Sequence, residues 1–524
     1  MVMSKKSYLE QMKSITAENL FDGFLGHGLF AERMPPFLTS ELFLDFVKTA
    51  SPKIFENKDK GFIQYENIRN INIPRLLAIP EPMAYRNLCK CLSDNWANLI
   101  GHFEKYTLNH EYKVSRIHIR KIKDSKIIFV MGDYDETYEL EVVDEKKHLF
   151  DLNHKNFSED DYPEPDLLIG KQYQVKADIS NCFPSIYTHS FCWALVGKAY
   201  SKAHKVGNWF NDIDLYIRNL KSQETHGILI GPHTSNLLSE IILVVVDDEL
   251  LKKGYVFIRN IDDYTCFAES NEKAERFLID LANALKHFNL SLNHKKTEIG
   301  KLPFAASEGW VRQLNSFNGI TEKAFLNFKD IQSYLDTAID LMQRNKDNSA
   351  ILNYTIKVLE KKRFTPNALS YYLKTIHHLI LIYPYLLIVV DNYVFQPLGV
   401  TNDEIEKIAN NILTMGSEKN INEARSYALY WAIKYNFKLS ETLFEAVKDS
   451  KDCVLLLLAY LHDKKYCKRS SLKPYRDLAE HLKVNDFDEY WLFIYEVLAK
   501  DKLTKYWKKM KEAKITFIKN DFAI

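Results

Sequence analysis

The sequence lacks the cysteine patterns that mark zinc-binding and disulfide-rich proteins. It has seven cysteines in 524 residues, with no Cys-x-x-Cys pair and no matching histidine spacing. We therefore expect neither a structural zinc site nor a disulfide framework. This cysteine usage is typical of a protein kept in a reducing, cytoplasmic environment.

Long apolar runs are also missing. The most apolar segment, from Leu379 to Val390, is interrupted by Pro384 and followed by Asp391. It is far shorter than the ~20 apolar residues that cross a bilayer. The first residues are not followed by the apolar run of a signal peptide, so we expect no association with a membrane.

The net charge has no strong sign, because the formal value is only +1. The chain is therefore not a strongly basic protein of the kind that covers nucleic acid along its length. This does not exclude a polymerase, in which only the nucleic-acid groove needs a positive potential.

No Gly/Ser-rich linker or low-complexity tract divides the chain, but the pattern of apolar and polar residues changes along its length. Residues 1–60 mix short helical patterns with loops, residues 61–310 alternate between strand and helix patterns, and residues 311–524 have almost only helical patterns. We predict an α+β fold with these three parts as domains. The last part is expected to be all-α, with a HEAT-like stack as one arrangement.

One predicted strand carries a candidate catalytic acid. From Tyr173 to Ile179, apolar and polar residues alternate with the period of a strand that buries one face. Asp178 lies on the polar face near the end of this strand, before Pro184 stops further pairing. A single acid at a strand end carries little meaning without a partner.

The segment from Tyr255 to Ala268 provides two further acids. Its two apolar and aromatic runs flank Asn260, Ile261, Asp262 and Asp263, which predicts a hairpin with adjacent carboxylates at its turn. Such neighbours repel each other and resist desolvation unless a cation neutralises them. A surface turn with two harmless aspartates is the alternative for this segment taken alone.

Asp178, Asp262 and Asp263 together supply three carboxylates on two strands. Phosphoryl transfer uses this arrangement to hold two Mg²⁺ ions about 3.5–4 Å apart, with Mn²⁺ as a substitute. By contrast, Asp247 and Asp248 follow an apolar run in a helical frame with Lys252. We interpret this second acidic pair as a solvated helix end outside the site.

Five segments in this order resemble motifs of reverse transcriptases, and more closely those of the bacterial abortive-infection and defence-associated branch that includes AbiK. They are a fingers segment at 73–80, a first palm motif at 178–190, a second at 226–235, the catalytic hairpin at 260–263 and a further palm motif at 292–297. The resemblance implies right-hand polymerase fingers and palm, followed by a helical C-terminal domain.

The resemblance also implies roles for the acids. Asp178, Asp262 and Asp263 match the metal ligands, with the Ile179 carbonyl as a further contact. Position 260 departs from the family, which most often has tyrosine where this chain has Asn260. The ligands are intact, but the ring that lies against the primer end is absent, so the handling of a primer is left open.

Four residues match positions that contact the nucleotide. Phe183 matches a steric gate that excludes the ribose 2′-hydroxyl, with an ordinary core phenylalanine as the alternative. Gly231 matches a backbone position close to the nucleotide, or is a simple turn glycine. Arg75 matches a triphosphate clamp and Lys296 a general acid for the leaving pyrophosphate, unless both are ordinary surface residues.

The function implied by the resemblance is a metal-dependent DNA polymerase of antiphage defence, acting on dNTPs in the cytoplasm. Members of this branch make single-stranded DNA attached to a tyrosine of the protein, either untemplated or copied from a partner non-coding RNA, and homo-oligomers are expected. The 30 tyrosines of this chain give no basis for choosing one. The alternatives are an RNA-templated reverse transcriptase of a mobile element and a non-catalytic polymerase-fold binding module, which would not need three crowded acids.

Overall fold

A computed structural model describes residues 7–69, 74–119, 127–129, 138–140, 149–151, 163–305, 307–317, 320, 323–346, 348–439 and 443–522. The chain forms two compact units that alternate along the sequence. The first consists of Met1–Ala31, Thr39–Phe62 and Ala78–Pro303, and the second of Glu32–Leu38, Ile63–Leu77 and Phe304–Ile524. The three-domain division expected from the sequence stays a prediction.

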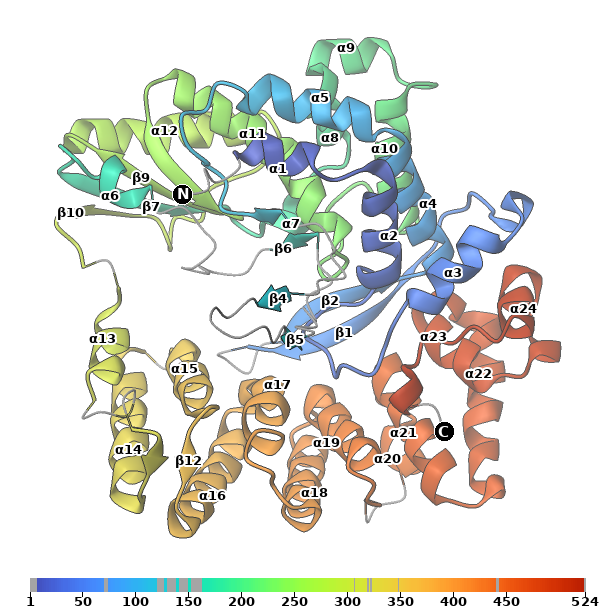
Figure 1. The fold of residues 1–524 in the computed structure, drawn as a ribbon. Helices are drawn as coiled ribbons and strands as arrows, with labels where there is room; N and C mark the ends of the chain where they lie inside the picture. Colours follow the sequence, from blue (N-terminus) through green and yellow to red (C-terminus); the bar gives the residue numbers. More distant parts are fainter. Residues whose placement is uncertain are drawn as a thin grey trace. The chain divides into compact units, whose positions relative to one another are not determined.

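The first unit contains a four-stranded antiparallel sheet with the strand order β10-β7-β9-β8 (Figure 1). Its strands are β7 (Tyr173–Asp178), β8 (Val256–Asn260), β9 (Asp263–Ala268) and β10 (Glu298–Lys301). The predicted strand before the first acid and the predicted hairpin are therefore both present. Because β8 and β9 are consecutive and β7 pairs with β9, all three acids come to one end of the sheet.

Two long helices complete the core of this unit. Helix α12 (Asn271–Lys286) packs on β7, β9 and β10, and helix α11 (Thr234–Lys252) packs against α12. The buried residues of α12 include Phe277, Leu281 and Leu285, which repeat at helical spacing and form its apolar face. Helix α11 is buried on nearly all sides. This mixture of sheet and helices confirms the predicted α+β class.

The first unit also contains shorter elements. They are α1 (Tyr8–Lys13), α2 (Ala17–His27), α3 (Glu41–Thr49), η1 (Pro52–Ile54), α4 (Pro82–Asp94), α5 (Trp96–Thr107), β3 (His118–Ile119), β4 (Ile127–Phe129), β5 (Tyr138–Leu140), β6 (Phe150–Asp151), α6 (Glu164–Leu167), α7 (Cys182–Ser185), α8 (His189–Val196), α9 (Lys198–Ala203) and α10 (Trp209–Asn219).

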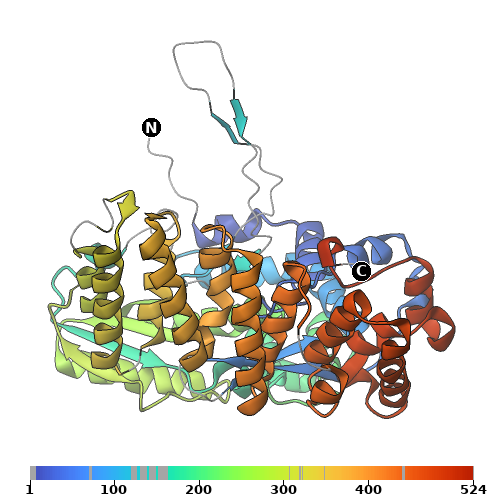
Figure 2. The same cartoon turned by 90° about the horizontal axis from the view of Figure 1, so that it is seen from below.

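The second unit is a stack of helices, drawn from yellow to red in Figure 2, in which helices pack on neighbours one or two positions away in the sequence. Its helices are α13 (Gly309–Asn315), α14 (Phe328–Arg344), α15 (Ser349–Leu359), α16 (Pro366–Ile382), η2 (Pro384–Leu386), α17 (Leu387–Val390), η3 (Asp391–Phe395), α18 (Asn402–Glu418), α19 (Asn422–Lys434), α20 (Leu443–Val447), α21 (Cys453–Tyr466), η4 (Arg469–Leu472), α22 (Lys473–Asn485), α23 (Phe487–Val497), η5 (Lys500–Lys502), α24 (Lys505–Glu512) and η6 (Asn520–Phe522). Such stacking is typical of helical-repeat folds.

Short strands also belong wholly or largely to this unit. They are β1 (Phe62–Ile68), β2 (Pro74–Pro80), β11 (Phe325–Leu326) and β12 (Arg363–Phe364), paired as β1 with β2 and β11 with β12. Among the helices that the structure describes, none has both the length and the apolar character needed to cross a bilayer.

The second unit contains a buried acid, Glu423. Glu423, at the start of α19, accepts hydrogen bonds from the Asn67 side chain at 2.7 Å and from the Ile68 N–H at 2.6 Å. Burial nevertheless raises the pKa of Glu423 to about 8, against an ordinary value of 4.5. Its carboxyl group is therefore protonated in the folded protein at neutral pH.

This buried acid predicts a pH-dependent stability. Between the unfolded and folded pKa values the native state binds more protons, so the free energy of unfolding falls as the pH rises from about 5 to about 8.5. We expect urea unfolding to show this loss in the wild type and a smaller loss in Glu423→Gln, which cannot ionise. Equal pH dependence in the two proteins would contradict the assignment.

Candidate active site

The sheet brings the three predicted acids to the same end. Asp178, the last residue of β7, lies opposite Asp263, the first residue of β9. Asn260 also pairs with Asp263, so Ile261 and Asp262 form the turn between β8 and β9. The strand register therefore produces the juxtaposition that the sequence predicted.

The turn has an unusual backbone. Ile261 has a φ of 60°, in the left-handed region that β-branched residues rarely adopt. The N–H of Ile179 donates to the carbonyl of Asp262 at 3.1 Å, which ties the turn to the chain just after β7. The backbone at 261–262 is thus fixed by neighbouring strands rather than by its own residue preference.

The acids lie in an electrostatically unfavourable position. Only 7% of Asp178 is exposed. Asp263 itself is exposed. Its pKa still rises to about 6, because the surrounding protein partly desolvates the carboxylate and because Asp262 and Asp178 add negative charge, while Lys296 acts in the opposite direction. A positive charge placed between such carboxylates relieves this strain.

Lys296 already supplies one positive charge at the site. Its Nζ lies 2.7 Å from Oδ2 of Asp178, although most of the lysine side chain is exposed. This hydrogen bond raises the pKa of Lys296, which keeps the ammonium protonated at neutral pH. The Asn293 N–H donates to the Asp178 carbonyl at 2.8 Å, so the loop carrying the lysine is fixed to β7.

The donor set fits a hard divalent cation. Mg²⁺ prefers carboxylate oxygens and binds through a few of them together with substrate phosphates, and three such residues meet here on adjacent strands. Within the described part of the chain, however, no three acidic, histidine or cysteine side chains already converge as a ligand cluster. The roles of Asp178, Ile179, Asp262 and Asp263 as metal ligands stay predictions.

Phe183 follows Asp178 in the short helix α7 and is 9% exposed. Its carbonyl accepts the N–H of Ile228 at 2.9 Å, which joins the first predicted palm motif to the second. The close approach of the two segments also requires glycine at position 227, because a Cβ added there would lie 2.8 Å from the carbonyl oxygen of Pro184. The burial of Phe183 is compatible with both a core residue and a steric gate, so the gate stays a prediction.

Gly231 has a structural reason to be glycine. Its φ is +130°, and an added Cβ would lie 2.9 Å from the carbonyl oxygen of Ala78 and 3.3 Å from the Cβ of Ala31. The neighbouring Ile230 carbonyl accepts the Ala78 N–H at 2.7 Å. Close packing against β2 therefore excludes a side chain here, and the nucleotide contact stays a prediction.

Arg75 lies in the part of β2 that belongs to the second unit, whereas the acids lie in the first. The structure therefore does not test the predicted contact between this arginine and a triphosphate.

The interpretation of Asp247 as a solvated helix end is wrong. Helix α11 continues to Lys252, and Asp247 is only 1% exposed because it binds the guanidinium of Arg259. The sequence contained a signal for this contact. Arg259 stands in an apolar strand and Glu240 in an apolar helix, and buried charges of this kind need partners.

Residues 143–336, which contain the three acids and Lys296, match the family model described as reverse transcriptase (RNA-dependent DNA polymerase). This part of the chain is therefore similar in sequence to the polymerase domain of reverse transcriptases. No protein of curated function matches the chain.

Among solved structures, the chain is similar to telomerase from Candida tropicalis. The complex with a fragment of telomeric RNA has 10% sequence identity and a TM-score of 0.29, over 70% of this chain and 63% of the telomerase chain. The apo enzyme has 10% identity and a TM-score of 0.32, over 78% and 75% of the two chains. This chain thus spans less than two thirds of the first telomerase chain.

The packing at Gly231 gives a stability prediction. We expect Gly231→Ala to reduce the free energy of unfolding by ~1–3 kcal/mol, because it combines a strained backbone with a clash against Ala78. The matched control is Gly254→Ala, at a glycine with a φ of +77° and nothing within 4 Å of the added Cβ. Urea unfolding that shows no greater loss for Gly231→Ala than for the control would contradict this explanation.

Proposed function

We propose that this chain is a metal-dependent DNA polymerase of reverse-transcriptase type, with Asp178, Asp262 and Asp263 as the ligands of two Mg²⁺ ions. The observation that carries the proposal is the meeting of these acids at one end of the sheet, inside the segment that matches the reverse-transcriptase model. The raised pKa of Asp263 supports it, because the repulsion among the acids favours a bound cation.

Bound ions would activate the attacking hydroxyl and neutralise the triphosphate. The chain's own residues then have separate tasks. The three carboxylates hold the charge in place, and the protonated Nζ of Lys296 provides a proton for the leaving pyrophosphate. The ring of Phe183 excludes the 2′-hydroxyl, so dNTPs are the substrates.

The biological setting of the proposal is bacterial antiphage defence in the cytoplasm. Its support is the resemblance of five segments to the abortive-infection branch, together with the helical second unit. On this proposal the enzyme forms homo-oligomers and makes single-stranded DNA attached to one of its tyrosines. Synthesis is either untemplated or copied from a partner RNA.

A second candidate is an RNA-templated reverse transcriptase of a mobile element. The family model favours it by its description as an RNA-dependent DNA polymerase. A non-catalytic binding module is a weaker candidate, because it would have no need to keep carboxylates that repel each other.

The acids provide the first test. We expect the double variant Asp262→Ala, Asp263→Ala to lose detectable incorporation of radiolabelled dNTPs while keeping its circular dichroism spectrum and melting temperature, because removing repelling charges does not open the core. Asp248→Ala, at a partly exposed acid bound to Lys252, is the matched control. A folded and fully active double variant would refute the metal site.

Phe183 provides a test of substrate choice. Replacing it with valine should lower the preference for dNTP over rNTP in kcat/KM by at least about tenfold, since the ring would no longer collide with the 2′-hydroxyl. Phe191→Val, at a fully buried phenylalanine of α8, controls for lost packing. Unchanged selectivity in Phe183→Val would show that the residue only fills the core.

The mode of priming is tested on the purified protein, which is treated separately with DNase, RNase and protease before extraction with phenol. We expect DNA that stays in the phenol phase until protease releases it, and sequencing would show whether it copies an RNA. Activity that appears only with an added primer and template would favour the mobile-element enzyme.

A further inference from the structure

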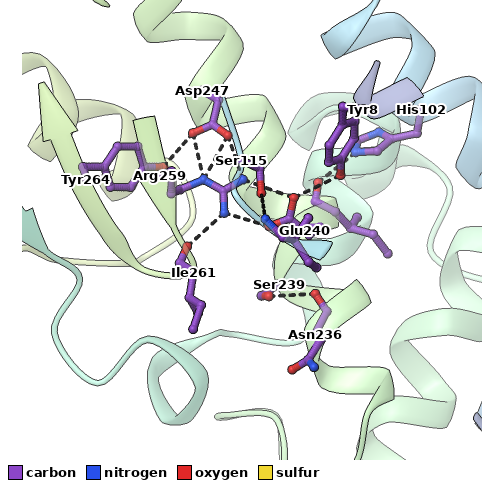
Figure 3. A network of polar contacts seen from close by, with 12 residues as sticks. Tyr8, His102, Ser115, Asn236, Ser239, Glu240, Asp247, Arg259, Ile261 and Tyr264 are labelled. Atoms are coloured by element: carbon purple, nitrogen blue, oxygen red, sulfur yellow. Dashed lines mark hydrogen bonds and ion pairs between the residues drawn. The ribbon is translucent and has the colours of Figure 1, made fainter. Parts of the chain in front are cut away.

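A fully buried arginine lies next to the catalytic turn. Arg259, in β8, is 0% exposed and is surrounded by two acids of helix α11 (Figure 3). Its Nε and Nη2 donate to Oδ2 of Asp247 at 2.9 and 2.7 Å, and its Nη1 donates to Oε1 of Glu240 at 2.7 Å. These contacts fix the plane of the guanidinium, because each acid binds a different edge of it.

The same guanidinium reaches the turn that carries the predicted metal ligands. Nη1 of Arg259 also donates to the carbonyl of Ile261 at 2.9 Å. Ile261 is the residue with the left-handed backbone, and Asp262 and Asp263 follow it directly. The hydrogen bond therefore links a rigid buried group to the strained peptide that orients both acids.

The hairpin is held from both of its strands. Arg259 in β8 pairs directly with Tyr264 in β9, and the Tyr264 hydroxyl donates to Oδ1 of Asp247 at 3.0 Å. Asp247 thus binds one residue on each strand, close to the turn. The backbone of Arg259 is also fixed, since its N–H donates to Val114 at 2.9 Å and its carbonyl accepts the Arg116 N–H at 2.8 Å.

Such a network is a poor source of stability. Removing charges from water costs several kcal/mol per ion, and well-packed apolar residues are often as stabilising as a buried ion pair. A buried arginine that binds two acids is better explained as a means of fixing the local backbone geometry. The geometry fixed here is that of the turn between β8 and β9.

We propose that Arg259, anchored by Asp247 and Glu240, is a positioning residue that holds Ile261 in its left-handed conformation and thereby orients Asp262 and Asp263. The inference rests on the proposed function, because the two acids are ligands only if the site binds metal. It assigns a task to Asp247, which the sequence pattern had placed outside the site.

The test compares Arg259→Lys with the wild type. Lysine keeps the positive charge but has a single donor centre, which cannot replace the planar fork that reaches both acids and the carbonyl. We expect kcat for dNTP incorporation to fall about 10–100-fold and Mn²⁺ binding, measured by calorimetry, to weaken at least about tenfold. The KM for dNTP should change by less than about threefold, since nucleotide contacts are not altered.

A rescue variant separates positioning from general damage. Glycine adopts a positive φ without steric cost. The double variant Arg259→Lys, Ile261→Gly should therefore have a kcat at least about tenfold higher than Arg259→Lys alone. The control is Tyr255→Phe, which removes the 2.6 Å hydrogen bond to Asp280 next to the opposite end of β8 and should leave kcat and Mn²⁺ binding unchanged. If Arg259→Lys does not fold, Asp247→Asn replaces it, because asparagine keeps the shape and loses the anchoring charge.

Several results would overturn the inference. They are a folded Arg259→Lys protein with wild-type kcat and Mn²⁺ affinity, a Tyr255→Phe protein with an equal loss, and a double variant that recovers nothing. A wild type without polymerase activity would instead refute the proposed function. The comparison of Mn²⁺ binding between wild type and Arg259→Lys would then still decide whether Arg259 positions the acids.

Discussion

Mutual repulsion among three carboxylates is the constraint around which the first unit is organised. Asp178 and Asp263 face each other across two strands, and Asp262 lies in the adjoining turn. Partial desolvation of the exposed Asp263 carboxylate and the charges of the other two acids raise its pKa to about 6. An arrangement of this kind persists only if the surrounding backbone enforces it and a cation compensates it. Lys296 contributes one positive charge from its loop. The carboxylate oxygens suit a divalent ion that would balance the negative charge left on the three acids.

The surrounding structure fixes this end of the sheet by close backbone contacts. Gly227 allows the second predicted palm motif to lie against Pro184, and Gly231 allows it to lie against Ala78, so both contacts need residues without a side chain. Next to the turn, the buried guanidinium of Arg259 is paired with two acids, Asp247 and Glu240. The acidic cluster, in which Lys296 is a cationic partner of Asp178, thus lies beside a buried ion-pair network formed by Arg259, Asp247 and Glu240.

The second unit follows different physical rules. Its helices stack in sequence order, and α19 and α21 are buried on almost all sides, so their polar residues must be satisfied within the protein. Glu423 achieves this partly by hydrogen bonds and partly by binding a proton. No repeat period is visible in the sequence, because stacking requires only an apolar face at each interface and not the same residues.

The sequence by itself determined the strand before Asp178, the acidic hairpin and the order of the motifs, because alternation and turn chemistry are local properties. It also determined the α+β class and the helical second half. Only the tertiary structure decided the state of Asp247, whose burial depends on Arg259 lying across from it. It likewise decided the need for glycine at position 231, which comes from Ala78 in a distant segment. Contacts between remote segments depend on how elements pack, and no local pattern of residue types encodes that.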